Sequence, residues 1–264
     1  MKFSVIITTF NRPKHLQKAY ASVLLQSQTP NEVIIINNGK NFYKKNFFPQ
    51  QKKIKLKIIN SKKNLFPSKA RNKGAKISKN NFLAFLDDDD VWQKNYLLEA
   101  KKIILRKKGK IILSKIYKKK SNSETLFKDP TNINLTELFV KNLGVTGSNI
   151  VINKKLFFSL GGYKSELEPS EDKSLVIEAL LKKTKIFISK SKVFFSTHEE
   201  LRLTTNYFKL RCGTKNFYKK YKKLMSFSQK IKVLKKLNIF RIKSGQIHFV
   251  LNFFFFFLLT KIIN

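Results

Sequence analysis

Short runs of apolar residues alternate with segments of helical periodicity over the first 120 residues of the chain. Most of these runs are rich in β-branched or aromatic residues, which predicts buried β-strands. The run at residues 54–59 alternates between apolar and polar positions and predicts a more exposed strand. The expected strands cover residues 3–10, 32–37, 54–59, 82–86 and 110–117.

Three helices are predicted between these strands. The first begins at Pro13, because proline suits the first turn of a helix, with Asn11 just before it as a candidate cap. Ser68 is positioned to cap a second helix that ends at Ile77, and a third helix is expected around residues 94–106. Buried strands that alternate with helices indicate an α/β fold with a mainly parallel central sheet flanked by helices.

Polar clusters follow three of the predicted strands. They are Thr8–Asn11, Asn37–Gly39 and Asp87–Asp90. In a parallel α/β sheet, ligands bind at the carboxyl ends of the strands. The three clusters are therefore expected to converge in space, although they lie far apart in the sequence.

Residues 121–200 have a less regular pattern. A Gly-Gly pair at 161–162 ends a short helical segment, and Ser170 is positioned to cap the next helix. Glu171 and Asp172 occupy the first turn of that helix, where acidic side chains interact favourably with the helix dipole.

The tail, residues 206–264, contains 14 Lys and Arg and no acidic residue. Its apolar run at 247–259 is shorter than the ~20 residues that span a membrane. A basic helical segment beside an aromatic apolar run is typical of an interfacial contact with an anionic membrane. The alternative is a C-terminal helix that packs on the domain and exposes a face of lysines.

The overall charge informs the choice of partners rather than the fold. The chain has 264 residues, 55 Lys and Arg and 16 Asp and Glu, for a formal net charge of +39. Nucleic acid, an anionic membrane or phosphorylated substrates would fit this charge, and a coding bias toward Lys, Asn, Ile and Phe would also explain it. One cysteine, Cys212, excludes an internal disulfide, and Asn11, Arg12 and Pro13 interrupt the apolar N-terminus before a signal peptide can form. Cytoplasmic residence is therefore expected.

One quarter of all the acidic residues are consecutive, at Asp87–Asp90. Adjacent carboxylates repel one another, so a cation is expected to compensate them. Carboxylates directly after a buried strand suit Mg²⁺ or Mn²⁺, which binds one or two carboxylates together with substrate phosphates. A solvated acidic loop, or capping of the following helix, would explain the run without a ligand. Arg71, shortly upstream, is suited to bind phosphate.

Four segments, in their order and spacing, resemble glycosyltransferase family 2, whose members have the GT-A fold. They are SVIITTFNRPKHLQKAYASVLLQS, NEVIIINNG, ARNKGAKISKNNFLAFLDDDDVW and GGYKSELEPSED. The resemblance covers residues 2–205. It implies a GT-A domain at 1–205, with a nucleotide-sugar-binding half at 1–120 and an acceptor half at 121–205, followed by a basic C-terminal helical extension at 206–264.

The resemblance also implies an activity. The expected enzyme moves a sugar from a nucleoside diphosphate donor to a hydroxyl acceptor with inversion, and it uses Mg²⁺ or Mn²⁺. The acceptor would be a saccharide or a lipid-linked hydroxyl group, in the synthesis of a cell-surface or lipid-linked polysaccharide. The enzyme would contact the inner face of the cell membrane peripherally, and no nucleic acid is expected as a partner.

Individual residues take roles from the family's motifs. Asp172 would be the catalytic base, with Glu171 as the second candidate, because a carboxylate can accept the proton of the acceptor hydroxyl. Asp87, Asp89 and His198 would bind the metal ion, and Asp89 is the strongest candidate. The nucleotide-sugar site would include Arg71 at the donor phosphates and Asp88 near the ribose, together with Thr8, Phe10, Asn11, Asn37 and Asn38.

The sequence departs from the family pattern at one point and leaves alternatives open. Asn37 and Asn38 stand where the family often has acidic residues, so uridine, guanosine and thymidine diphosphate donors all stay open. A nucleic-acid-binding protein would explain the charge, but it has no role for the acidic run. An inactive family member would retain the fold, although the intact DxD and ED patterns argue against it. His15 and His248 are interpreted as structural, and Trp92 is expected to pack under the acidic loop.

Overall fold

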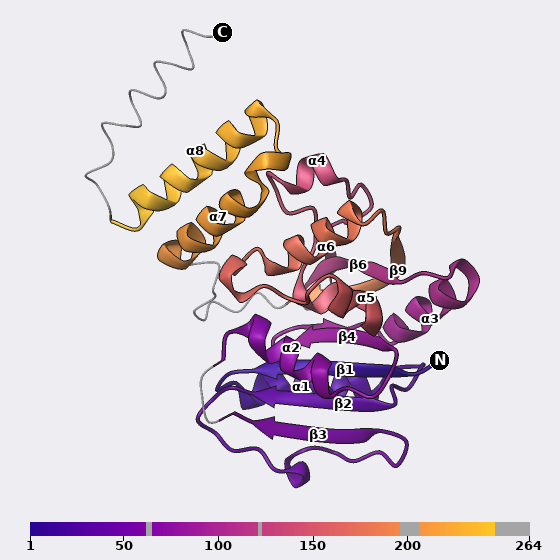
Figure 1. Cartoon of the computed structure of the whole chain (residues 1–264). Helices are drawn as coiled ribbons and strands as arrows, with labels where there is room; N and C mark the ends of the chain where they lie inside the picture. The colour runs from indigo at the N-terminus through magenta and orange to yellow at the C-terminus, as the bar shows by residue number, and fades with distance from the viewer. Residues whose placement is uncertain (62–64, 121–122, 196–205, 246–264) are drawn as a thin grey trace, which may run out of the picture.

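A single mixed β-sheet forms the centre of the protein. The computed structural model describes residues 1–61, 65–120, 123–195 and 206–245 (Figure 1). Within these residues the sheet has nine strands in the order β3-β2-β1-β4-β8-β6-β9-β5, and β7 pairs with the later residues of β6. The strands are β1 Phe3–Thr9, β2 Glu32–Asn37, β3 Lys55–Asn60, β4 Phe82–Asp87, β5 Val91–Trp92, β6 Ile111–Lys120, β7 Ser123–Lys128, β8 Ile150–Asn153 and β9 Ile186–Phe195.

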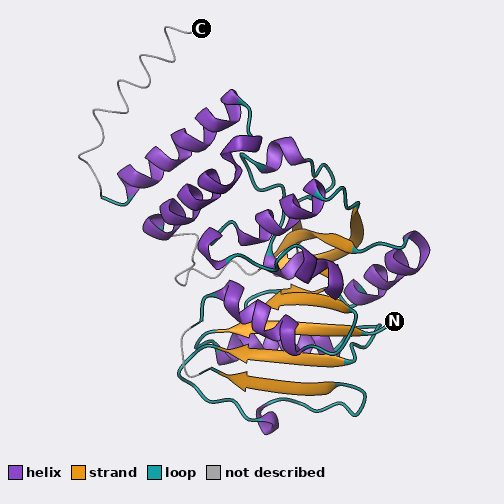
Figure 2. Ribbon diagram, viewed as in Figure 1, coloured by secondary structure: helices purple, strands orange, loops and turns teal. Residues whose placement is uncertain are grey.

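The first half of the sheet, β3-β2-β1-β4, is entirely parallel. Its two central strands, β1 and β2, are buried along their whole length, because helices cover both faces (Figure 2). Helices α1 (Pro13–Leu24) and α3 (Tyr96–Lys107) pack on one face, and α2 (Pro67–Ile77) packs on the other. This arrangement brings the carboxyl ends of β1, β2 and β4 to one edge of the sheet.

The second half of the sheet is mixed. Strand β8 is antiparallel to both β4 and β6, whereas β6 and β9 are parallel. Helices α4 (Leu135–Leu138), α5 (Lys154–Ser159) and α6 (Glu171–Leu181) share the apolar core of α2. Therefore α2 and the first turn of α6 lie on the same face of the sheet. The predicted fold class, a mainly parallel α/β sheet flanked by helices, is confirmed.

All five predicted strands and all three predicted helices are present, but three predicted side-chain caps are wrong. Ser170 directly precedes α6, yet its side chain makes no capping hydrogen bond. The side chain of Asn11 does not cap α1; its Oδ1 accepts the Lys40 N–H instead (2.8 Å). Ser68 does not cap α2, because the helix already begins at Pro67, and the Ser68 N–H donates to Glu168 Oε1 (2.8 Å). Proline at the first helical position fixes the start of the helix without a side-chain cap.

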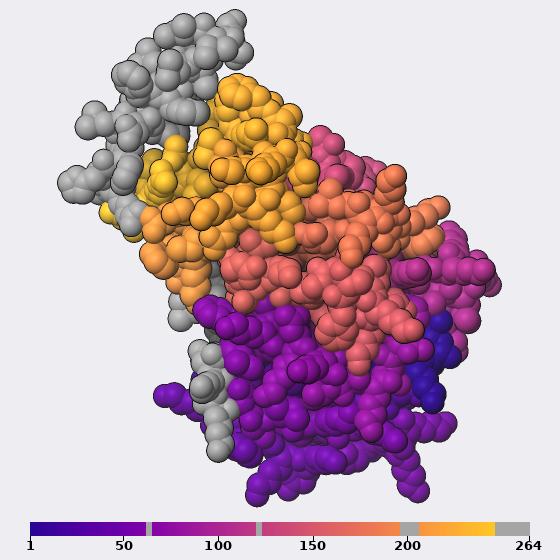
Figure 3. All heavy atoms as spheres, viewed as in Figure 1, coloured from indigo at the N-terminus to yellow at the C-terminus, as the bar shows by residue number. Residues whose placement is uncertain are grey.

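The predicted basic C-terminal helical extension consists of α7 (Tyr207–Tyr221) and α8 (Phe227–Lys243), drawn in orange and yellow (Figure 3). Phe217 and Tyr221 belong to the same apolar core as α6. A Cβ atom on Gly213 would lie 1.8 Å from the carbonyl oxygen of Glu168, so only glycine lets α7 approach this backbone. The extension therefore packs directly on the segment that leads into α6.

Within the described residues, no helix combines the length and apolarity needed to cross a bilayer. The apolar run at 247–259, with His248, lies outside the described residues. Its predicted contact with a membrane therefore stays a prediction.

Lys173 is a buried cation between α6 and the extension. The residue as a whole is 6% exposed, and its Nζ lies 3.9 Å from the centroid of the Phe217 ring. Burial, with repulsion from Lys236 as a smaller cause, lowers the pKa of Lys173 to about 7. The protonated form of this lysine therefore opposes folding.

Lys173→Met is expected to raise the free energy of unfolding by about 1–4 kcal/mol at pH 6. The folded pKa of about 7 lies below the ordinary value of 10.5, so the unfolded chain binds more protons between these values. The cost of the buried charge is complete below pH 7, declines as the pH rises, and is absent above 10.5. Urea denaturation at pH 6 and pH 10 should show the advantage of the variant shrinking with pH. An advantage that stays constant would contradict this interpretation. Lys232→Met, at an exposed position of α8, is the control.

Candidate active site

The four aspartates after β4 differ in exposure. Asp87 is the last residue of β4, and the Asp90 N–H donates to the Asp87 carbonyl (3.2 Å), which closes a turn. The side chains of Asp87 and Asp89 are 28% and 23% exposed, whereas that of Asp88 is 7% exposed. Asp90 is also buried. Exposed and buried carboxylates therefore alternate along the loop, and the two residues of the DxD pattern are the exposed ones.

Arg71 of α2 is the centre of a buried charged cluster. Its Nη2 lies 2.6 Å from Asp87 Oδ1, and its Nη1 lies 3.2 Å from Glu171 Oε1 and 3.9 Å from Asp172 Oδ1. The guanidinium carbon is 5.4 Å from the centroid of the Tyr163 ring. The acidic loop and the first turn of α6 thus meet at one arginine, although they are far apart in the sequence.

Burial raises the pKa of both Glu171 and Asp172 above the ordinary range of carboxyl groups. For Asp172, the Arg71 guanidinium is the main opposing influence, and a hydrogen bond from the Gly147 N–H also favours the carboxylate. For Glu171, the negative charge of Asp172 reinforces the effect of burial, and Arg71 opposes it. A carboxylate with a raised pKa is a better proton acceptor near neutral pH.

Several buried polar atoms in this cluster have no hydrogen-bond partner among the described residues. They are Arg71 Nε, Glu171 Oε2, Asp172 Oδ1 and the Tyr163 hydroxyl. Buried polar groups are normally paired, so such atoms indicate groups that a ligand or water would satisfy. A positive donor and two carboxylate acceptors side by side can bind a phosphate group next to a hydroxyl group.

A short turn of 3-10 helix before β8, Gly147–Asn149, connects the acidic loop to α6. Ser148 Oγ accepts the Asp87 N–H (3.0 Å), and the Ser148 carbonyl accepts the Trp92 Nε1–H (2.8 Å). Trp92 therefore packs beneath the acidic loop, as predicted. A Cβ atom on Gly147 would lie 2.5 Å from Arg71 Nη2, so only glycine fits against the guanidinium. This turn was not predicted from the sequence. The feature that could have indicated it is Gly-Ser-Asn directly before an apolar run.

Arg12 is a second arginine at the acidic loop that sequence reasoning missed. Its Nη1 lies 3.3 Å from Asp88 Oδ1 and 3.1 Å from Asp89 Oδ2. Thr9 Oγ1 donates to Asp88 Oδ2 (2.7 Å), so both oxygens of Asp88 have protein partners. Burial nevertheless raises the pKa of Asp88 to about 7. The sequence feature that could have indicated this role is the position of Arg12 three residues after the end of β1, the strand that pairs with β4. The predicted ribose contact of Asp88 stays a prediction.

The two asparagines after β2 differ in their surroundings. Asn37 is fully buried: its amide donates to Asn60 Oδ1 (2.8 Å) and to the Asn41 carbonyl, and its Oδ1 accepts the Gly39 N–H (3.0 Å). These bonds shape the loop. Asn38 is also buried, but its Oδ1 has no hydrogen-bond partner among the described residues. Asn38 is therefore the better placed of the two to contact a ligand.

The remaining predicted nucleotide-site residues follow β1. Thr8 is buried and lies opposite Asp87 in the sheet register, and the Asn38 N–H donates to the Thr9 carbonyl (2.9 Å). Phe10 is 48% exposed, and Asn11 has a positive φ of 55°. The three polar clusters at the strand ends thus converge, as predicted.

The acidic loop has the chemistry of a divalent-cation site, although no group of three metal-binding side chains occurs within the described residues. Asp87 and Asp89 offer two partly exposed carboxylates on one turn. Mg²⁺ commonly binds one or two carboxylates while substrate phosphates and waters complete its shell, so these residues fit the ion. A cation would bind in competition with Arg71 and Arg12. His198 lies outside the described residues.

Comparisons with known proteins agree with this geometry. The family model "Glycosyl transferase family 2" matches residues 4–161, which is more than half of the chain. An uncharacterized glycosyltransferase of Rickettsia bellii is 40% identical over 96 residues, which cover 36% of this chain and 14% of the relative. The poly(ribitol-phosphate) beta-N-acetylglucosaminyltransferase TarS of Staphylococcus aureus is 24% identical over 206 residues, 74% of this chain and 35% of TarS. The chain thus spans only part of the length of these relatives.

Solved structures show the same fold. TarS residues 1–349 in complex with UDP-GlcNAc match with a TM-score of 0.64 at 19% identity, over 95% of this chain and 76% of that one. The mannosyltransferase PcManGT from Pyrobaculum calidifontis, in complex with GDP-Man and Mn²⁺, matches with a TM-score of 0.64 at 11% identity, over 89% and 69%. The fold is the GT-A fold. With the family model covering both the β1 region and the acidic loop, the chain belongs to glycosyltransferase family 2.

Proposed function

We propose that this protein is an inverting, divalent-metal-dependent glycosyltransferase that moves a hexose-type sugar from a nucleoside diphosphate to a hydroxyl acceptor. The observation that carries the proposal is the contact of Arg71 with Asp87 on one side and with Glu171 and Asp172 on the other. A group suited to bind phosphate thus touches both the acidic loop and two carboxylates that can accept a proton.

The reaction needs a base and a stabilised leaving group. Asp172 accepts the proton of the acceptor hydroxyl as the hydroxyl oxygen bonds to the anomeric carbon. The bond from that carbon to the diphosphate breaks, and the electron pair stays on the phosphate oxygen, where the Arg71 guanidinium stabilises it. Attack from the side opposite the diphosphate inverts the anomeric configuration. Glu171 is the second candidate for the base, and its bond to Arg71 favours a positioning role.

Asp87 and Asp89 are the proposed ligands of Mg²⁺ or Mn²⁺, and His198 is a third. When bound, the ion supplies positive charge to the diphosphate. Two observations support this assignment: these two aspartates are the exposed ones of the acidic loop, and the Pyrobaculum mannosyltransferase binds Mn²⁺ with its donor.

The proposed nucleotide site surrounds the ends of β1 and β2. Thr8, Phe10, Asn11 and Asn38 line it, with Asp88 on the ribose side. Asn38 Oδ1, which has no hydrogen-bond partner among the described residues, supports a base that has a ring N–H, as uracil, thymine and guanine have. Both neighbours fit this condition, because one binds UDP-GlcNAc and the other GDP-Man.

The acceptor is proposed to be a saccharide or a lipid-linked hydroxyl group in the synthesis of a cell-surface polysaccharide. The name of TarS, which refers to poly(ribitol-phosphate), supports a polymeric acceptor. The basic helices α7 and α8, which contain no acidic residue, support a peripheral contact with the anionic inner face of the cell membrane.

A binding screen tests the proposed function. Calorimetry with UDP-, GDP- and dTDP-sugars, each with Mn²⁺, with Mg²⁺ and with a chelator, should reveal one preferred base whose affinity depends on the ion. Arg71→Met should weaken that binding about 10-fold or more, whereas Arg106→Met, at an exposed position of α3, should leave it unchanged. If no nucleotide sugar binds under any condition, the proposed function is wrong.

Removal of residues 245–264 is expected to move the protein from the membrane fraction to the soluble fraction, because the apolar run would be lost. Flotation with vesicles that contain anionic lipid measures the change. Replacement of the 247–259 run by a Gly/Ser linker of equal length is the matched variant and should act like the deletion. Unchanged flotation in both variants would show that the apolar run does not bind the membrane.

A further inference from the structure

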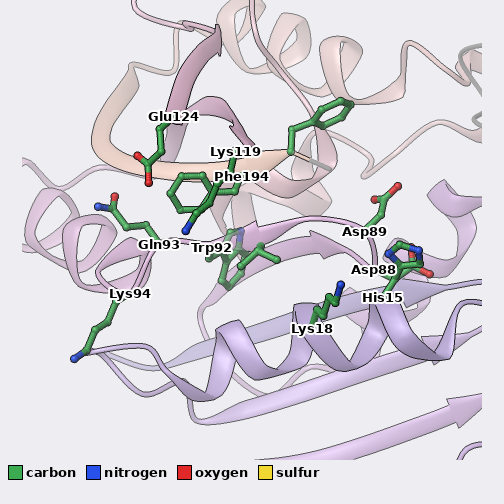
Figure 4. A pocket seen from close by; sticks show the side chains of 12 residues that line it. His15, Lys18, Asp88, Asp89, Trp92, Gln93, Lys94, Lys119, Glu124 and Phe194 are labelled. Carbon is green, nitrogen blue, oxygen red and sulfur yellow. The ribbon is translucent and has the colours of Figure 1, made fainter. Parts of the chain in front are cut away.

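An open groove of about 520 Å³ begins at the acidic loop and continues along β5 (Figure 4). Its floor and walls come from α1, from β5 with the residues that flank it, and from the strands β6, β7 and β9. Its lining includes Lys18, Asp88, Asp89, Lys119, Glu124 and Phe194. This groove lies on the α1 side of the sheet, whereas the Arg71 cluster lies on the α2 side.

Three lysines and three carboxylates line the groove, and each of these carboxylates has a cationic partner outside the lining. Asp88 and Asp89 contact Arg12, and Glu124 Oε2 lies 2.7 Å from Lys192 Nζ. By contrast, Lys18 and Lys119 have no carboxylate partner in the part of the chain that the structure describes. Figure 4 shows both side chains reaching toward the groove, from α1 and from β6, on opposite walls. An anionic ligand would therefore find two uncompensated ammonium groups there.

The wall opposite α1 also has an aromatic surface. The Phe194 ring lines the groove, with Lys119 Nζ 5.4 Å from its centroid. Trp92 forms part of the floor and is held by its bond to Ser148 and by stacking on Tyr96 (centroids 4.2 Å apart). A flat ring beside a cation suits a ligand that alternates an apolar sugar face with a charged group.

We propose that this groove binds an anionic saccharide chain, with phosphate or carboxylate groups at Lys18 and Lys119 and a sugar ring against Phe194. Resting on the proposed function, the chain would be the part of the acceptor that is remote from the reacting hydroxyl. A neutral glycan would leave both ammonium groups without partners. An acceptor with a negative charge on every unit would interact favourably with Lys18 and Lys119 at the same time. The groove would therefore bind anionic polymers more tightly than neutral ones.

The test uses the full chain and three probes of equal length: a galacturonic acid hexamer, a phosphodiester-linked mannose hexamer and neutral maltohexaose. Calorimetry should show binding of at least one anionic hexamer and about 10-fold or weaker binding of maltohexaose. The double variant Lys18→Ala/Lys119→Ala should weaken the anionic hexamer about 10-fold or more. The choice between the two anionic hexamers distinguishes phosphate from carboxylate.

The matched control is Lys14→Ala/Lys107→Ala, which removes the same charge at exposed positions outside the groove. An equal loss in both double variants, equal binding of maltohexaose, or tighter binding of single-stranded DNA through the same two lysines would overturn the proposal. Nucleotide-sugar binding is measured in parallel. Donor binding without hexamer binding overturns only the groove assignment, and hexamer binding without donor binding overturns only the proposed function.

Discussion

Asp172→Asn is expected to lower the rate of sugar transfer by about three orders of magnitude while donor affinity stays within about twofold, because general-base catalysis contributes on this scale. Asparagine keeps the shape of the side chain but cannot accept the acceptor's proton. Transfer measured with saturating donor, together with donor binding by calorimetry, separates the two effects. Unreduced transfer by the variant would show that Asp172 is not the base.

Glu171→Gln is the matched variant on the neighbouring position. Glu171 contacts Arg71 more closely than Asp172 does, at 3.2 Å against 3.9 Å, so its loss should act mainly through the arginine. A smaller reduction in rate, of about 10-fold, with weaker donor binding is expected. If Glu171→Gln has the larger effect on rate at unchanged donor affinity, the roles of the two carboxylates are reversed.

Stability provides a check that Asp172→Asn remains folded. Burial raises the pKa of Asp172 above its unfolded value, so the folded chain binds more protons and ionisation opposes folding. This cost is absent below the unfolded pKa, grows as the pH rises from the unfolded to the folded pKa, and is constant above the folded pKa. The variant avoids this cost. At neutral pH its free energy of unfolding, measured by urea denaturation, should therefore be lower than that of the parent chain by no more than about 1 kcal/mol, the contribution of the lost Gly147 hydrogen bond. The rate of the parent enzyme should fall as the pH is lowered through the raised pKa.

The fold followed from the sequence because its strongest signals are local. Runs such as residues 3–9 and 32–37 are apolar throughout, and only a strand covered by helices on both faces buries such a run completely. Convergence of the three polar clusters follows from parallel strands alone. The starts of the helices were harder to predict, since Pro67 and Ser68 both suit a first turn and the proline decides the boundary.

The parts of the site that escaped prediction depend on long-range contacts. Arg12 is one basic residue among 55. Nothing in the local sequence shows that its side chain contacts Asp88 and Asp89, which follow the neighbouring strand β4. Gly147 packs against Arg71, although the two residues lie far apart in the sequence, on opposite sides of β4 to β7 along the chain. The sequence pattern suggests that Asn37 contacts a ligand. In the structure, however, its side-chain amide donates to Asn60 Oδ1 and accepts the Gly39 N–H, so it stabilises the loop after β2. Such roles depend on tertiary packing, which residue type and spacing do not determine.

The acidic loop combines four carboxylates with two arginines, which compensate part of its negative charge. Arg71 compensates Asp87, and Arg12 compensates Asp88 and Asp89. In the proposed metal-bound enzyme, the cation would bind the carboxylates and the two guanidinium groups would be available to contact the donor phosphates. Removing one carboxylate should then affect the ion much more than the fold.

Asp89→Asn is expected to weaken Mn²⁺ binding in the presence of nucleoside diphosphate on the order of 100-fold, and to abolish metal-dependent release of that diphosphate from the donor sugar. The amide retains an oxygen but loses the negative charge that a hard cation requires. Because Asp89 is partly exposed and Arg12 keeps its contact with Asp88, the fold should change in stability by less than about 1 kcal/mol.

Electron paramagnetic resonance of free Mn²⁺ measures the affinity directly and does not depend on turnover. Asp129→Asn is the control, since this aspartate is also partly exposed and paired with a single cation, Lys115, but lies outside the acidic loop. It should leave Mn²⁺ binding unchanged. Full turnover or parental Mn²⁺ affinity in Asp89→Asn would remove Asp89 from the metal site, and the same experiment on Asp87→Asn would then decide whether the loop binds a cation at all.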